Sequence, residues 1–320
     1  MASLPRTALF ITLLLSLAPA SGMAQQHREM IAAKFQERLE KIAHEMPGVL
    51  GIQVLDLDGG ARFGVNEEFV FPQGSAIKVA LLATLYARAE AGELSLTDRV
   101  TIRSSDRTGG SGILDQFDDS GSAMSLHDLA VPMIVLSDNM ATNILIDQVG
   151  MEQVNALMSE LGFPAIRLQR KMIRREDSAR GNENLATPQQ AAGLMARILR
   201  CDLPMSESSC RAMKQILEIR RPADEGPIQE PVPRSIPTAS KYGSITGVRT
   251  GWGAVDLPGR PYALAVMGNF SESSIVLEAI REISFLSYEY FSRLAGATEY
   301  GTRVDPELLR QVRPGPPAGG

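Results

Sequence analysis

Patterns typical of β-strands stand at the two ends of this chain, and helical patterns fill its middle. Near the N-terminus, two apolar, β-branched segments flank the turn signal Asp58-Gly59-Gly60, and three more strand-like segments follow residue 239. Strands so far apart in sequence share one core most simply when the two ends pair. The sequence therefore predicts an α+β fold with one antiparallel sheet. The predicted strands cover residues 48–57, 61–65, 240–244, 248–257 and 262–270.

Helical patterns predict what surrounds this sheet. Amphipathic helices at 27–46 and 272–294 should cover it, and residues 100–220 should be mostly helical and belong to an inserted subdomain. The polar, aperiodic stretch 174–186 is typical of a surface loop, and five prolines in 222–238 indicate an extended connection. We expect the following parts: a sheet subdomain from 26–71 and 234–296, a helical subdomain at 72–233, and a tail at 297–320 whose end is disordered.

Residues 1–24 have the features of a secretory signal peptide. Arg6 supplies a positive start, residues 8–17 form an apolar run, and small residues follow at 18–24. The run is too short to span a bilayer comfortably, although a retained anchor is the alternative. No later segment reaches a membrane-spanning length. We therefore expect a periplasmic or secreted protein without stable membrane insertion, and a monomer.

Charge and cysteine content narrow the function classes. The net charge is −5 and no basic patch stands out, which argues against nucleic-acid binding. The mixed-charge stretches 174–180 and 218–222 are typical of solvated surface. Cys201 and Cys210, the only cysteines, flank a loop between two helical patterns. In an oxidising compartment they can form a disulfide, and two free, partly buried thiols are the alternative. With no histidine near either, a zinc site or cysteine nucleophile is not expected.

The segment 75–91 is apolar nearly all round, which indicates a buried helix. It opens with Ser75-Ala76-Ile77-Lys78, and residues three apart on a helix share a face. A serine hydroxyl becomes a good nucleophile when a base takes its proton, and a buried lysine with a lowered pKa can be that base. The alternative is that Ser75 only caps the helix and that Lys78 is a surface lysine.

Two further motifs favour a catalytic serine–lysine pair over a helix-capping serine and a surface lysine. Ser137-Asp138-Asn139 and Lys241-Tyr242-Gly243 follow in order along the chain. Together with Ser75-x-x-Lys78 they resemble the motif set of class A β-lactamases and other penicillin-recognising serine hydrolases. The resemblance extends over about residues 27–295, with supporting stretches at 110–114, 140–147, 186–188 and 247–255. It implies a β-lactamase/transpeptidase-like fold.

The resemblance also implies a role for each matching residue. Ser75 would be acylated, Lys78 would be its base, and Ser137 would relay a proton to the leaving nitrogen. Asn139 would hold the side-chain carbonyl of the substrate, and Lys241 would orient Ser137 and a substrate carboxylate. The backbone N–H groups of Ser75 and of Ser244, which follows Gly243, would form the oxyanion hole. Arg249 would assist with the carboxylate, unless it is a solvated strand arginine.

Two departures from the family pattern concern substrate binding and release. Tyr242 replaces a small hydroxyl residue, and its ring would narrow the carboxylate pocket if it pointed into the cleft. The loop before Thr187-Pro188 lacks the family's Glu-x-x-x-Asn, whose glutamate activates the deacylating water. Glu176, Asp177 and Glu183 are candidates for that base, and each is also typical of a solvated loop carboxylate.

Other catalytic systems do not assemble from the remaining residues. The histidines, His27, His44 and His127, follow no G-x-S-x-G motif, and no zinc motif or cofactor fingerprint is complete, so no cofactor or metal is expected. The sequence favours a serine β-lactamase that acts on small β-lactams. The alternatives are a penicillin-binding peptidase or esterase with an acyl-peptide substrate, and a non-catalytic binding protein.

Overall fold

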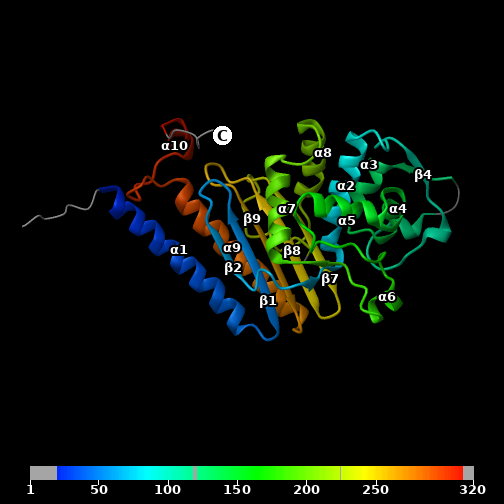
Figure 1. Cartoon of the computed structure of the whole chain (residues 1–320), viewed down its shortest axis with the longest axis horizontal. Coiled ribbons are helices and arrows are strands. Elements are labelled where there is room, and N and C mark those ends of the chain that lie inside the picture. Colours follow the sequence, from blue (N-terminus) through cyan, green and yellow to red (C-terminus); the bar gives the residue numbers. More distant parts are fainter. Residues whose placement is uncertain (1–19, 118–120, 224, 313–320) are drawn as a thin grey trace, which may run out of the picture.

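Five antiparallel strands form the central sheet, in the order β2-β1-β9-β8-β7. The computed structural model describes residues 20–117, 121–223 and 225–312. The sheet joins the two ends of the chain, because β1 pairs along its whole length with β9 (Figure 1). This confirms the predicted α+β fold and leaves β7 at an edge. The strands are β1 (Val49–Asp56), β2 (Arg62–Val65), β7 (Thr238–Ile245), β8 (Val248–Val255) and β9 (Tyr262–Asn269).

Strand β9 shows why both faces of the sheet are covered. Leu264 and Val266 belong to a core shared with α1 (Ala20–Glu45) and α9 (Ser273–Ala295). The alternate residues Ala263, Ala265 and Met267 belong to a second core, which includes α7 (Pro188–Arg200). The period-two pattern of a strand sends successive side chains to opposite faces. Helix α7 thus packs on the sheet, although its position within 72–233 predicted a place in the helical subdomain.

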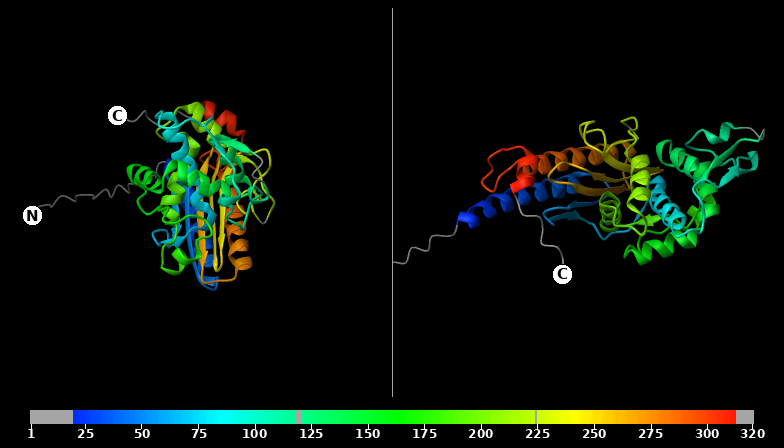
Figure 2. Two further views of the ribbon diagram at one scale, coloured as in Figure 1. Left: turned by 90° about the vertical axis from the view of Figure 1, so that its right-hand side faces the viewer. Right: turned by 90° about the horizontal axis from the view of Figure 1, so that it is seen from above.

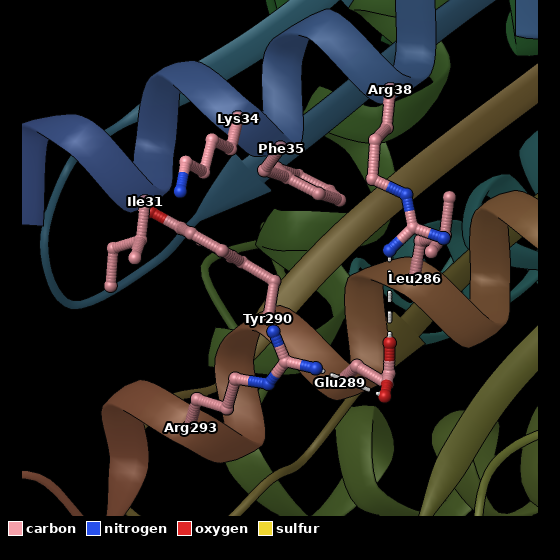
Figure 3. Close-up of a pocket in the computed structure, with 8 residues that line it drawn as sticks. All are labelled: Ile31, Lys34, Phe35, Arg38, Leu286, Glu289, Tyr290 and Arg293. Atoms are coloured by element: carbon pink, nitrogen blue, oxygen red, sulfur yellow. Dashed lines mark hydrogen bonds and ion pairs between the residues drawn. The ribbon is translucent and has the colours of Figure 1, made fainter.

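The terminal helices α1 and α9 pack against each other through aromatic rings. Phe35 of α1 stacks on Tyr290 of α9 with ring centroids 4.5 Å apart (Figure 3). At the exposed edge of this contact, Arg38 lies 3.9 Å from the Glu289 carboxylate. The aromatic contact contributes more than the exposed ion pair, which solvent screens. These helices cover the sheet face opposite the one on which α7 packs.

The helical part lies at one end of the molecule, and α1 and α10 (Pro306–Val312) reach the other (Figures 1 and 2). Its central helix is α2, whose residues 78–87 are all buried, as the apolar pattern predicts. The surrounding elements are α3 (Leu126–Val135), α4 (Asn139–Val149), α5 (Met151–Glu160), α8 (Glu207–Glu218), and two small sheets, β3 (Phe71–Pro72) with β6 (Leu185–Ala186) and β4 (Arg99–Thr101) with β5 (Ala123–Ser125).

Local structure corrects the predictions for two segments, 174–186 and 75–91. Thr187 caps α7 by accepting a hydrogen bond from Gln190 N, as expected for a threonine before Pro188. The stretch 174–186 is not loop throughout, because it holds the short helix α6 (Arg175–Ala179) and β6. The polar composition of this stretch gives no apolar period, so the short helix α6 was not predicted. The segment from Ser75 begins as the 3₁₀ turn η1 (Gly74–Ile77), and α2 (Lys78–Glu90) starts three residues later than predicted.

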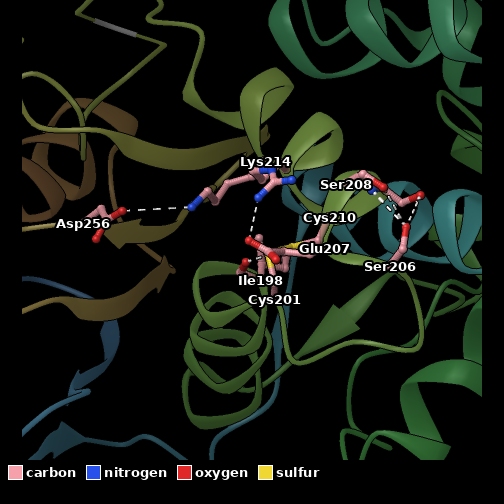
Figure 4. Close-up of a disulfide and its surroundings, with 10 residues drawn as sticks. Ile198, Cys201, Ser206, Glu207, Ser208, Cys210, Lys214 and Asp256 are labelled. Carbon is pink, nitrogen blue, oxygen red and sulfur yellow. Dashed lines mark hydrogen bonds and ion pairs between the residues drawn. A yellow bond between two sulfur atoms is a disulfide. The ribbon is translucent and has the colours of Figure 1, made fainter. Parts of the chain in front are cut away.

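Cys201 and Cys210 form a disulfide, with their Cα atoms 5.6 Å apart (Figure 4). The bond connects the end of α7 to α8, and Cys201 adopts a left-handed conformation with φ 52° as α7 ends. It crosses the corner between two helices, as one of the two sequence interpretations expects.

Within the described ranges, no helix is both long and apolar enough to cross a bilayer. The proposed signal peptide lies outside those ranges up to residue 19, and residues 20–24 begin α1. The tail from residue 313, expected to be disordered, also lies outside them.

Candidate active site

The nucleophile candidate Ser75 lies on the 3₁₀ turn η1, directly before α2. The backbone N–H of Lys78 donates to the Ser75 carbonyl oxygen, an i to i+3 contact. In a 3₁₀ turn, residues three apart eclipse each other, so Ser75 and Lys78 project from the same side. The predicted shared face is therefore present, although through a tighter helix than expected.

Buried hydrogen bonds from Gln73 fix this turn against the sheet. Trp252 Nε1 on β8 donates to Gln73 Oε1 at 2.8 Å, and Thr250 Oγ1 donates to the Gln73 carbonyl at 3.0 Å. The Gln73 amide in turn donates to the Phe71 carbonyl at 2.8 Å. These hydrogen bonds fix the position of Gln73, because any shift would leave a buried polar group without a partner.

Ser137 lies in the connection between α3 and α4 and adopts φ 53°, which is uncommon outside glycine. Its neighbour Asp138 holds this conformation in place. One Asp138 oxygen accepts from Ala141 N at the start of α4, and the other accepts from Ile113 N and Leu114 N. A residue that its neighbours hold in a sparsely populated conformation suggests that the direction of its side chain matters.

Two buried lysines, Lys78 of α2 and Lys241 of β7, meet at the Ser137 hydroxyl. Lys78 Nζ lies 3.2 Å from Ser137 Oγ, and Lys241 Nζ lies 3.1 Å from the same oxygen. Lys78 also donates to the Ser137 carbonyl at 2.7 Å and to Asn139 Oδ1 at 3.1 Å. Thus α2, the α3–α4 connection and β7 converge on one hydroxyl, and the three motifs form one cluster.

Burial lowers the pKa of both lysines. Lys78 is 0% exposed, and this desolvation lowers its pKa to about 7, although Asp138 partly opposes the shift. Burial likewise lowers the pKa of Lys241 well below its usual range, and the positive charges of Arg221 and Lys78 add to the effect. An amine with a pKa near 7 can both accept and return a proton at neutral pH.

The edge of β7 lies directly against η1. A Cβ atom on Gly243 would lie 2.1 Å from the Gln73 carbonyl oxygen and 2.8 Å from Ala76 N, so only glycine fits. A Cβ atom on Gly74 would lie 2.9 Å from Ser244 N. The backbone N–H of Ser244, on an edge strand, is therefore close to the turn that carries Ser75. Two such amides can stabilise negative charge on a substrate oxygen.

Comparison with known proteins identifies the family. The model of the β-lactamase enzyme family, Beta-lactamase2, matches residues 34–291. The chain belongs to this family. A β-lactamase of Rhodobacter capsulatus is 30% identical over 197 residues, which cover 61% of this chain and 65% of that protein. The match thus spans less than two-thirds of this relative's length.

Two solved structures resemble this chain over most of its length. The β-lactamase from Sphaerobacter thermophilus has 32% sequence identity and a TM-score of 0.73, and the match covers 81% of this chain and 97% of that one. A variant of PBP-A, solved as an acyl-enzyme complex with penicillin G, has 25% identity and a TM-score of 0.72, covering 81% and 97%.

The β-lactamase fold does not bring every predicted site residue to the cluster. Arg249 Nη1 donates to the carbonyls of Ile245 and Val248 in the β7–β8 turn. The register pairs Arg249 with Ser244 and pairs Lys241 with Trp252, so the arginine lies on the face opposite Lys241. The guanidinium stabilises the turn in this structure and forms no hydrogen bond with Lys241 or Ser137.

Tyr242 also lies on the face away from η1. It pairs with Gly251, where a Cβ atom would meet Ile228 and Ile280 of the α9 side. Its neighbour Lys241 pairs with Trp252, whose indole reaches Gln73 on the other side. Because paired residues share a face, the register places Tyr242 on the face of β7 opposite to that of Lys241.

The three candidate deacylation carboxylates are all engaged within their own loop. Glu183 accepts from Arg170 Nη2 at 2.7 Å and from the Ser178 hydroxyl. Asp177 pairs with Arg174 and Arg180, at 3.3 and 3.4 Å. Glu176, which is largely exposed, lies 3.8 Å from Arg180. None of the three has a hydrogen bond or ion pair with Ser75, Lys78 or Ser137.

One residue near the cluster was missed by sequence reasoning. Arg221, in a stretch interpreted as solvated surface, donates to the Ile134 carbonyl at 3.1 Å and to Ser240 Oγ at 2.8 Å. Although part of its side chain reaches solvent, its Nε is buried without a partner. Burial lowers the pKa of Arg221 to about 10. No sequence signal distinguishes it from Arg220 beside it.

No metal site accompanies the cluster. Among the residues that the structure describes, no group of three or more histidine, cysteine, aspartate or glutamate side chains is arranged to hold a metal ion. The polar groups around Ser137 are amines, an amide and hydroxyls, which suit proton transfer and anion binding better than metal coordination.

Proposed function

We propose that this protein opens β-lactam rings through an acyl-enzyme on Ser75. The observation that carries the proposal is the meeting of Lys78 Nζ and Lys241 Nζ on Ser137 Oγ, beside the turn that bears Ser75. A serine, a buried amine of suitable basicity and a second hydroxyl are the groups that acyl transfer needs. Membership of the β-lactamase family supports the same reaction.

In the proposed acylation, Ser75 Oγ attacks the lactam carbonyl and transfers its proton to Lys78 Nζ. The developing oxyanion is held by the backbone N–H groups of Ser75 and Ser244. The carbon–nitrogen bond then breaks. The nitrogen takes a proton from Ser137 Oγ, which regains one from Lys78. The short contacts among Lys78, Ser137 and Lys241 support this relay, and it restores the neutral Lys78 amine.

Asn139 and Lys241 are proposed to bind the substrate. The Asn139 amide is nearly buried, and its Nδ2 donates to the Gly109 carbonyl at 3.1 Å, which turns it toward the loop around residue 110. The Lys241 amine, with Arg221 beyond it, gives this side of the site a positive potential. A substrate carboxylate would be attracted there, and its charge would raise the pKa of Lys241.

Release of the acyl group is proposed to be slow. The loop carboxylates are occupied by arginines, so none is free to activate water beside the acyl-serine. This observation favours the second candidate, a penicillin-binding peptidase or esterase that forms a long-lived penicillin adduct. The capture of a PBP-A variant as a penicillin G acyl-enzyme is consistent with such behaviour on this fold.

We also propose that the protein works as an exported monomer, in the periplasm or outside the cell. The Cys201–Cys210 disulfide supports export because such bonds persist in oxidising compartments. Cell fractionation tests the location, and light scattering of the mature protein tests the monomer.

The decisive experiment incubates the mature protein with a chromogenic cephalosporin and follows colour and intact mass. A Ser75→Ala variant is the control. We expect one covalent adduct per molecule in the wild type, no adduct in the variant, and slow loss of the adduct. Rapid turnover without an adduct would refute slow release, and a folded wild type without colour or adduct would refute the proposed function.

A further inference from the structure

A small cavity of about 80 Å³ lies between α1 and α9, on the sheet face opposite the one that α7 covers (Figure 3). Each of the two helices contributes four lining residues. Within each helix these residues are spaced three or four apart or stand side by side, so they share one face. None of the residues of the lysine–serine cluster lines this cavity.

The floor of the cavity is apolar. Phe35 of α1 and Leu286 of α9 are buried there, and Phe35 stacks on Tyr290. Ile31, which is 37% exposed, forms part of the rim. Because a water molecule takes about 30 Å³ of the liquid, the cavity suits a polar head group with a short apolar chain rather than a large ligand.

The Tyr290 hydroxyl is a hydrogen-bond donor that the protein does not use. Tyr290 is only 7% exposed, and among the residues that the structure describes its hydroxyl has no hydrogen-bond partner. Its ring extends from α9 toward Ile31 and Lys34 (Figure 3). Burial, with the Asp56 carboxylate nearby, raises the pKa of Tyr290 to about 12, so the hydroxyl keeps its proton at neutral pH. A nearly buried donor without an acceptor is unfavourable, and an acceptor in the cavity would remove that penalty.

The charges around the cavity do not cancel, because three cations and one carboxylate line it. Glu289 is shared between Arg38, at 3.9 Å, and Arg293, at 3.1 Å. Lys34 has no ion pair within the described ranges. In a chain with a net charge of −5, this cavity therefore has a local excess of positive charge.

The next cavity along the same two helices has the opposite balance of charge. Its cations are Arg38 and Lys41, and its carboxylates are Glu45, Glu278 and Glu282. An anion that approaches the α1–α9 surface is therefore attracted to the Lys34 end and not to the Glu45 end.

We propose that the cavity between α1 and α9 binds a small carboxylate that carries a short apolar chain. The carboxylate would accept a hydrogen bond from Tyr290 Oη and form an ion pair with Lys34 Nζ, while the chain would lie against Phe35 and Leu286. Such a ligand would contact both terminal helices and stabilise the native fold. The inference does not rest on the proposed function, because the cavity lies apart from Ser75.

Binding of butyrate tests the inference, with butyramide as the uncharged analogue of similar shape. For so few atoms we expect a Kd of about 1 mM, measured by saturation-transfer NMR titration at low salt. Butyramide should bind about three- to tenfold more weakly, because it lacks the charge that pairs with Lys34. Butyrate should also raise the thermal unfolding midpoint relative to an equal concentration of chloride.

Two variants and a matched control locate the site. Tyr290→Phe removes the hydroxyl but keeps the ring that stacks on Phe35, and Lys34→Gln removes the cation without an ion pair. Each should weaken butyrate binding about three- to tenfold without lowering the unfolding midpoint of the ligand-free protein. Lys41→Gln makes the same charge change on α1 outside this cavity and should bind butyrate as the wild type does.

Three results would overturn the inference. One is a wild type that does not bind butyrate at about 20 mM, well above the expected Kd. Another is a Tyr290→Phe variant that binds butyrate as tightly as the wild type. The third is equal weakening by Lys34→Gln and Lys41→Gln, which would mean that butyrate responds only to the overall charge of the helix.

Discussion

At the scale of single residues, the protonation of Lys78 governs when Ser75 can react. Burial lowers the Lys78 pKa to about 7, so the amine is neutral above that pH and charged below it. Only the neutral amine can accept the Ser75 proton. We therefore expect the acylation rate to fall about tenfold for each pH unit below 7. Stopped-flow acylation from pH 5 to 8 measures this, with circular dichroism to check folding, and a flat profile would contradict it.

Arg221 provides a second prediction at this scale. Its positive charge helps to lower the pKa of Lys241, and its guanidinium connects the Ile134 carbonyl of α3 to Ser240 of β7. In Arg221→Met, Lys241 should hold its proton to higher pH, so the alkaline limit of acylation should move upward. The maximum rate should also fall because Ser137 and Lys241 are less firmly positioned.

Ser240→Ala is the matched control for this prediction. It removes one acceptor of the Arg221 guanidinium but keeps the positive charge. The acylation rate should fall a little without any shift of the alkaline limit. If Arg221→Met also leaves that limit in place, its charge does not influence Lys241.

The proximity of Lys78, Ser137 and Lys241 was suggested by the order of the three motifs, and hydrogen bonds bring these side chains together. The catalytic roles of the motif residues stay predictions, and the position of Arg221 was not predicted. Arg221 stands beside Arg220 in a mixed-charge stretch, and only the tertiary structure buries its Nε. Arg249 shows the opposite problem: its position in the chain suggested a role at the cleft, but the β7 register places it on the other face.

At the scale of elements, the site depends on the close contact between β7 and η1. Gly243→Ala would place a Cβ atom 2.1 Å from the Gln73 carbonyl and push the strand away from the turn. We expect a loss of about 1–3 kcal/mol in unfolding free energy and a larger relative loss of acylation. Urea unfolding and adduct formation measure the two effects.

Gly296→Ala is a suitable control for this substitution. It lies just after α9, with φ −99°, and the nearest atom to an added Cβ is the Val304 carbonyl at 3.3 Å. It should leave acylation unchanged. Gly243→Ala acylating at the wild-type rate would show that the β7–η1 contact does not hold the oxyanion-binding amides.

The elements that sequence predicted well are those with strong periodicity. Strands β8 and β9 and helix α9 match their predicted ranges within a few residues, because apolar side chains recur with a clear period. The turn η1 and helix α6 were missed for a shared reason: each is about one turn long. At that length, tertiary contacts such as those of Gln73 decide the conformation.

At the scale of the whole molecule, the sheet made from both chain ends supports a cleft beside its edge strand. The sequence predicted this pairing of ends, but it could not place α7 on the sheet. Helix α7 covers the face where β9 presents Ala263 and Ala265, whose small side chains allow a helix to approach. Complementarity between a helix and the strand opposite it is not visible in either segment alone.

The disulfide between α7 and α8 gives the last prediction, which concerns global stability. It closes a loop with a sequence separation of 9 residues, and chain-entropy arguments assign such a loop about 2–3 kcal/mol of stabilisation. Cys201→Ser/Cys210→Ser should lower the unfolding free energy by roughly that amount in urea. Acylation of Ser75 under native conditions should be unchanged, because neither cysteine contacts the lysine–serine cluster. A double variant of full stability would mean that packing of Cys210 against Ile198, rather than the covalent bond, holds this corner.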